Sequence, residues 1–113
     1  MRRLALATLA AVAAPAALAA DPIVGSWRTE AGSTAAISPC GGAFCITIRS
    51  GQHAGKRIGN VSASGGGRYS GTIVDPASDK SYSGSATLSG ASLRLSGCVL
   101  GGLICRSQTW SRL

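Results

Sequence analysis

The 113-residue chain is poor in acidic and aromatic side chains, with four Asp or Glu, two Trp, two Tyr and one Phe. Its single histidine, His53, lies in a polar Gly-rich stretch with no evident carboxylate or nucleophile partner, which argues against a catalytic base. The cysteine spacings are C-x4-C and C-x6-C, which are neither the C-x2-C of common zinc sites nor the redox C-x-x-C motif. We therefore predict no enzyme activity, no catalytic residue, no cofactor and no metal site.

The first residues have the pattern of a cleavable signal peptide. Two arginines follow the initiator Met, an Ala- and Leu-rich stretch covers residues 4–18, and residues 17–19 form an A-x-A cleavage site. The apolar stretch is shorter than the ~20 residues that span a bilayer, so no stable membrane anchor is expected. The sequence predicts a signal peptide at residues 1–19, a single domain at residues 20–113, and export to the periplasm or the medium.

The basic residues outnumber the acidic ones without forming a cluster. Removal of the two leader arginines lowers the formal net charge from +7 to about +5. The other basic residues are spread singly, apart from Lys56-Arg57, whereas a nucleic-acid site needs a clustered basic patch with stacking aromatics. A solvated basic surface is expected, with no nucleic-acid partner, and no particular protein partner is indicated.

The rest of the chain has the pattern of an all-β domain. Apolar and polar residues alternate with a period of two, as in Ile46 and Ile48 between Thr47 and Arg49, which is typical of a half-buried strand. The predicted strands cover residues 23–30, 33–40, 44–50, 68–75, 80–89, 92–99 and 106–113, with a short eighth strand at 56–62 inside the Gly-rich stretch 51–67. Short turns between sequential strands predict an antiparallel meander, which removes its exposed edges by closing into a barrel of seven or eight strands.

The four cysteines form two pairs that are close in sequence, Cys40 with Cys45 and Cys98 with Cys105. Each pair brackets a turn of the predicted meander, which favours the local connectivity over the two crossed ones. A disulfide that closes so short a loop stabilises by roughly 2–2.5 kcal/mol in the chain-entropy model. Small exported domains commonly depend on such bonds, so we predict structural disulfides.

Two other motifs have simpler structural explanations. Residues 51–57 (GQHAGKR) differ from a phosphate-binding loop in spacing, and no Ser or Thr follows the Lys. Asp75 and Asp79 flank Pro76 in a turn, where Asp side chains commonly bond the backbone.

The two tryptophans lie near opposite ends of the predicted domain, Trp27 in a G-x-W signature and Trp110 in the last strand. The first and last strands of a closed barrel are neighbours, so both rings and an arginine are expected to meet there, with the guanidinium stacked on indole. One interpretation is a plug that fills one end of the barrel. The other is a small-molecule cavity lined by Trp27, Tyr69, Tyr82 and Trp110.

Several segments together resemble one family of small exported bacterial proteins, DUF2147. They are DPIVGSWRT at residues 21–29, ISPCG at 37–41, DP at 75–76 followed by KSYSG at 80–84, GCV at 97–99 and QTWSR at 108–112. The resemblance implies a lipocalin-like β-barrel and, as a hypothesis, a small hydrophobic ligand. The stretch 51–67 is shorter than the corresponding segment of most family members, which leaves fewer residues to line or cover a cavity.

Two hypotheses follow. The first is a periplasmic carrier or sensor that binds a small apolar molecule inside the barrel. The alternative is a protein-interaction module, such as an inhibitor or envelope-assembly factor, that uses exposed loops on a filled barrel. An apolar void of several hundred Å³ favours the first hypothesis, and a packed interior favours the second.

Overall fold

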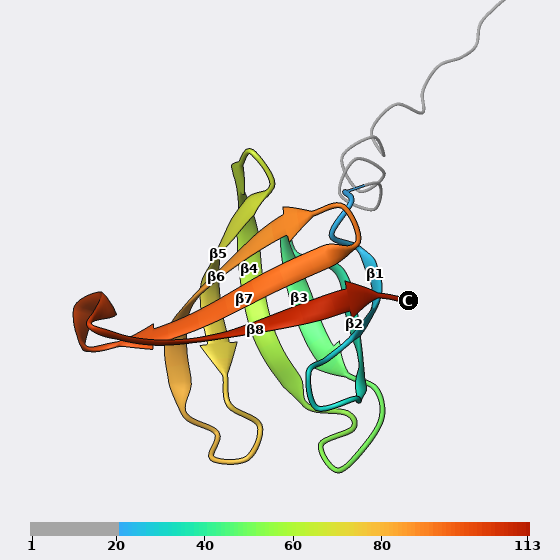
Figure 1. Cartoon of the computed structure of the whole chain (residues 1–113), viewed down its shortest axis with the longest axis horizontal. Helices are drawn as coiled ribbons and strands as arrows, with labels where there is room; N and C mark the ends of the chain where they lie inside the picture. Colours follow the sequence, from blue (N-terminus) through green and yellow to red (C-terminus); the bar gives the residue numbers. More distant parts are fainter. Residues whose placement is uncertain (1–20) are drawn as a thin grey trace, which may run out of the picture.

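The computed structural model describes residues 21–113, so the predicted signal peptide at residues 1–19 lies outside the described residues. Eight antiparallel strands follow one another around a closed barrel (Figure 1). The strands are β1 (Gly25–Arg28), β2 (Thr34–Cys40), β3 (Ala43–Ile48), β4 (Arg57–Gly65), β5 (Arg68–Val74), β6 (Ser81–Ser89), β7 (Ser92–Val99) and β8 (Ile104–Arg112). The predicted all-β meander and its closure into a barrel are confirmed.

The barrel is closed by a short pairing between its first and last strands. β1 pairs with β8 only through Trp27 opposite Arg112 and Arg28 opposite Ser111. The β7–β8 hairpin therefore extends past this seam, and its tip, a 3-10 turn at Leu100–Gly102, reaches away from the barrel (dark red in Figure 1). This turn is the only helical segment among residues 21–113.

Tight glycine turns connect several strands at one end of the barrel. Gly41 and Gly42 join β2 to β3, and both have positive φ (59° and 86°), as a two-residue type I′ hairpin requires. Gly66 and Gly67 make the corresponding turn between β4 and β5, with φ of 65° and 77°. The longer loops, residues 29–33, 49–56 and 75–80, gather at the opposite end, at the bottom of Figure 1.

β4 is longer than the sequence indicates. The expected short strand at residues 56–62 extends to Gly65, although Ser62, Ala63 and Ser64 carry small and exposed side chains and Gly65 has none. The pairing partners explain the extension, because Ala63 lies opposite Tyr69 and Gly65 opposite Arg68, with a register shift between them. The neighbouring strand β5 thus holds a segment that has little strand propensity of its own.

The inner face of β5, β6 and β7 contains a row of directly paired glycines. Gly71 lies opposite Gly84, and Gly84 lies opposite Gly97. A Cβ at Gly71 would come within 2.0 Å of the Asn60 carbonyl oxygen on β4. Glycine is required there because the strands coil sharply enough for one backbone to approach the next.

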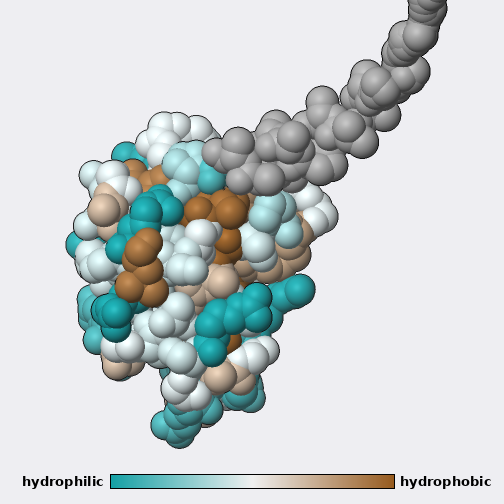
Figure 2. Space-filling model, turned by 90° about the vertical axis from the view of Figure 1, so that its right-hand side faces the viewer, coloured by the Kyte–Doolittle hydropathy of each residue, from teal (hydrophilic) through white to brown (hydrophobic). Residues whose placement is uncertain are grey.

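The hydrophobic core extends from the end of the barrel with the glycine turns, around Phe44 and Tyr69, to Ile58, Leu95 and Trp110 further along the barrel. Its largest fully buried side chains are Trp27, Phe44, Ile23, Ile37, Ile46, Leu93 and Val61. In β1 and β7, Trp27 and Leu93 lie between exposed residues, which is the period of two expected from the sequence, whereas in β3 Cys45 between Phe44 and Ile46 is also buried. On the face shown in Figure 2, hydrophobic residues appear as small separate areas among hydrophilic ones.

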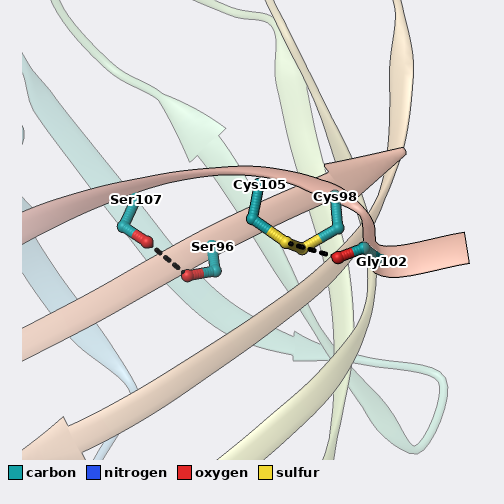
Figure 3. The surroundings of a disulfide bond; sticks show 5 residues. All are labelled: Ser96, Cys98, Gly102, Cys105 and Ser107. Atoms are coloured by element: carbon teal, nitrogen blue, oxygen red, sulfur yellow. Dashed lines mark hydrogen bonds between the residues drawn. A yellow bond between two sulfur atoms is a disulfide. The ribbon is translucent and has the colours of Figure 1, made fainter. Parts of the chain in front are cut away.

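Both predicted disulfides, Cys40–Cys45 and Cys98–Cys105, are confirmed. Cys98 lies directly opposite Cys105, and their bond holds the β7–β8 hairpin together near its tip (Figure 3). Cys45 instead lies opposite Ser38, so the first bond crosses the ladder diagonally. The tight two-residue turn places Cys40 opposite Ala43, which leaves Cys45 two positions further along.

Candidate functional site

The end of the barrel with the glycine turns is closed by the segment Asp21–Val24. Ile23 is fully buried and accepts a hydrogen bond at its carbonyl from Trp27 Nε1, at 3.0 Å. The guanidinium of Arg112 lies over the Trp27 ring, 4.2 Å from its centroid, and donates to the carbonyls of Pro22 and Val24. The expected stack of arginine on indole is therefore present, and it fastens the closing segment to the barrel.

Tyr69 belongs to the same closed end. Its hydroxyl donates a hydrogen bond to Asp21 Oδ1, and its ring packs edge-to-face on Phe44 with centroids 5.8 Å apart. Burial of the phenol raises the pKa of Tyr69 above its ordinary value, and the hydrogen bond to Asp21 and the charge of that carboxylate raise it further. Tyr69 therefore stays neutral and holds the closing segment in place.

The other end of the barrel is hollow. A cavity of about 680 Å³ opens between the loops at residues 29–33, 49–56 and 75–80. Its size falls in the range of about 300–1,000 Å³ that is usual for small-molecule sites. The floor is apolar and consists of Ile46, Ile48, Ile58, Ile73, Leu95 and Trp110.

Three polar side chains stand on the inner face between this floor and the mouth. Arg106 and Gln108 come from β8, and Tyr82 comes from β6; all three line the cavity. Gly97 separates Tyr82 from Arg106: it lies opposite Arg106, and a Cβ built on it would lie 3.2 Å from Tyr82 Cβ. Because Gly97 has no side chain, Tyr82 packs over it, beside the strand position that faces Arg106.

The orientation of the Gln108 amide follows from its neighbour. Trp110 Nε1 lies 2.9 Å from Gln108 Oε1, and an indole nitrogen can only donate. The amide oxygen is thus occupied by Trp110, and the amide NH₂ is the end left to donate to other groups. Gln108 therefore contributes hydrogen-bond donors beside the apolar floor.

A smaller hollow of about 360 Å³ lies under the projecting β7–β8 hairpin. It is lined by Asp75, Ser78, Lys80, Tyr82, Gly97, Val99, Ile104 and Arg106. Four of these residues, Asp75, Tyr82, Gly97 and Arg106, also line the larger cavity, so the two hollows share one rim. Ile104 is 54% exposed in this hollow, as an apolar residue at the edge of an open site.

The four aromatic residues predicted to line a cavity lie at different heights in the barrel. Tyr82 and Trp110 line the open cavity, whereas Trp27 and Tyr69 are packed into the closed end. The interpretation as a plug therefore fits Trp27 and Tyr69, and the interpretation as a cavity lining fits Tyr82 and Trp110. The ligand-binding role of the four side chains stays a prediction.

Sequence reasoning missed Arg106 and Gln108. The signal was available: counting back from the inward Trp110 with a period of two places Gln108 and Arg106 on the same face of β8.

His53 also lines the cavity. Asp75 accepts a bond from the Ala77 amide, as expected of a turn residue.

Asp79 at the tip of the same loop pairs with Lys56, with a Nζ to Oδ1 distance of 3.2 Å.

Within residues 21–113, no group of three His, Cys, Asp or Glu side chains is placed to hold a metal ion. Nor does any helix of this described part combine the length and hydrophobicity needed to cross a membrane.

The fold and the site define a class: an up-and-down, eight-stranded antiparallel barrel with one plugged end and one cavity, the architecture also found in lipocalins. A family profile described as "Uncharacterized protein conserved in bacteria (DUF2147)" matches residues 53–112, which is more than half of the chain. The chain therefore belongs to the DUF2147 family, as its motifs indicated. No curated protein and no solved structure matches it.

Proposed function

We propose that this protein is a non-catalytic carrier or sensor that binds a small, mainly apolar molecule in the open end of its barrel. The observation that carries the proposal is the cavity of about 680 Å³ above an apolar floor. Each Å² of apolar surface that a ligand removes from water here contributes about 25 cal/mol to the free energy of binding. Of the predicted aromatics, Tyr82 and Trp110 line this cavity, and we propose that they contact the ligand.

Export is part of the proposal. The two disulfides form and persist in oxidising compartments such as the bacterial periplasm. Cleavage after Ala19 would retain the whole closing segment Asp21–Val24, including the carboxylate that accepts from Tyr69. We propose that residues 1–19 are a signal peptide and that the remaining domain works in the periplasm or outside the cell.

Native mass spectrometry of the protein isolated from its own cells tests both parts. The expected species has lost residues 1–19, contains two disulfides and carries an additional small-molecule mass. A neutral apolar probe, N-phenyl-1-naphthylamine, should bind with a saturable rise in its fluorescence. No additional mass together with no probe binding would refute the carrier function, and an uncleaved chain would refute the export.

A second candidate function, protein interaction, is favoured by the open edge of β8. Only Ser111 and Arg112 of this strand pair with β1, so residues 104–108 face no other strand of residues 21–113 on that side. Leu103 beside this edge is 85% exposed. Open edges recruit strands from other chains. A bound protein or second copy in the same native spectra, in place of a small molecule, would support this alternative.

A further inference from the structure

The charge at the cavity rim indicates what kind of apolar molecule would fit. Among the lining residues of the two hollows, Arg106 and Lys80 are the permanent cations and Asp75 is the only carboxylate. Asp75 Oδ1 already accepts from the Ala77 amide at 2.9 Å, and Asp75 forms no ion pair with Arg106. The rim therefore has more positive than negative charge.

Arg106 has no acceptor among the described residues. The one ion pair of this part of the chain joins Lys56 to Asp79, and no hydrogen bond involves the Arg106 guanidinium. Arg112 on the same face of β8 differs, because Pro22, Val24 and the Trp27 ring hold it in place. The same strand thus carries one arginine committed to structure and one free to bind.

The neighbours of Arg106 are also hydrogen-bond donors. Gln108 offers its amide NH₂ because Trp110 occupies its oxygen. Tyr82, which packs over Gly97 and lines the same hollow as Arg106, offers a hydroxyl. A carboxylate accepts hydrogen bonds and donates none, so it matches this set of groups. Guanidinium and carboxylate can also meet through two parallel hydrogen bonds.

We infer that the ligand is an amphipathic anion, with an apolar chain on the floor of isoleucines, Leu95 and Trp110 and a single carboxylate held by Arg106 beside Tyr82 and Gln108. The inference rests on the proposed carrier function and adds the ligand's chemical class. It assigns Arg106 as the residue that selects for an anionic head group.

Displacement of N-phenyl-1-naphthylamine at low ionic strength tests this assignment. The competitors are decanoate, decan-1-ol and decylammonium, which share one chain length and differ in the charge of the head group. Decanoate should displace the probe about tenfold better than decanol, the difference expected of one charge-assisted hydrogen bond at a partly open site. Decylammonium should be the weakest competitor, because Arg106 repels it.

Two arginine variants distinguish an effect of Arg106 at the site from an effect of the protein's overall charge. Arg106→Gln should lose the preference for decanoate over decanol, measured as the ratio of the two competitors' displacement of the probe from that same variant, and a retained preference would overturn the inference. Arg94→Gln is the matched control, because Arg94 is exposed on the outer face of β7 and its replacement removes the same charge. The control should keep the full preference.

The outcomes distinguish a failure of the anionic-ligand inference from a failure of the proposed carrier function. Equal displacement by decanoate and decanol would overturn the inference and leave the carrier function standing. A preference lost equally in Arg94→Gln, or strongest displacement by decylammonium, would also overturn it. A probe that binds neither the natural protein nor the variants would overturn the carrier function and the inference together.

Discussion

The substitution Gly71→Ala should be among the most damaging single-methyl changes in this barrel. The new Cβ would lie 2.0 Å from the Asn60 carbonyl oxygen and 2.9 Å from Val61 Cα, and both are backbone atoms of β4. Neither can rotate away as a side chain would. β4 and β5 must therefore separate by about 1 Å before the first contact reaches 3.0 Å.

The expected loss of stability can be worked out from the hydrogen bonds between β4 and β5 that this separation breaks. Loss of two ladder hydrogen bonds costs about 2 kcal/mol, and forcing a methyl group into packed surroundings costs about 1–3 kcal/mol more. The lower entropy of the unfolded Ala variant returns about 0.4–1 kcal/mol. The net loss is therefore about 2–4.6 kcal/mol, a large part of the roughly 5–15 kcal/mol that stabilises a typical domain.

The other two glycines of the row provide graded controls. A Cβ at Gly84 would lie 2.3 Å from Ile73 Cγ1, a side chain that borders the cavity and can shift, so about 1–2 kcal/mol is expected. At Gly97 the nearest atom is Tyr82 Cβ at 3.2 Å, and the change should stay within about 1 kcal/mol. Urea unfolding followed by tryptophan fluorescence measures all three. Gly71→Ala as stable as Gly97→Ala would refute the close approach of β4 and β5.

Two further predictions concern the disulfide and the closed end. Replacing Cys98 and Cys105 by Ser should lower the free energy of unfolding by roughly 2.5 kcal/mol without abolishing probe binding; a normally stable variant that loses a metal- or redox-dependent activity would contradict the structural role. Tyr69→Phe should cost about 1–2 kcal/mol near neutral pH through the lost bond to Asp21. Because the folded-state pKa of Tyr69 is raised, its stabilising effect is complete below about pH 10 and is lost as the pH rises further. Urea midpoints measured from pH 7 upward should therefore converge for the two proteins, and a constant gap would contradict the raised pKa.

Most of the fold could be predicted because local signals agree with one another. Alternation in residues such as Ile46 and Ile48, and glycine pairs such as Gly41-Gly42, mark strands and turns within a few residues of their observed bounds. The cysteine pairs fall at hairpins for the same reason. The full length of β4 was not predictable from its own residues, because its last positions are held by Tyr69 and Arg68 of β5.

The site was less predictable because alternation gives the face of a residue and not its height in the barrel. Tyr69 and Tyr82 both point inward, yet Tyr69 begins β5 at the closed end and Tyr82 begins β6 at the open end. Antiparallel strands reverse direction, so equivalent positions in neighbouring strands lie at opposite ends. The register between strands determines which residues line the same cavity, and it depends on turn lengths and on long-range pairing.

The central claim, a ligand site at the open end alone, is tested most directly by the two indole N–H signals in a ¹H–¹⁵N correlation spectrum. Trp110 lies on the cavity floor, and Trp27 is fully buried in the closed end with its N–H bonded to Ile23. Titration with N-phenyl-1-naphthylamine should shift the Trp110 signal to saturation and leave the Trp27 signal in place, with Trp27→Phe providing the assignment. Equal shifts of both signals, or no shift of either, would contradict a binding cavity between the loops at residues 29–33, 49–56 and 75–80.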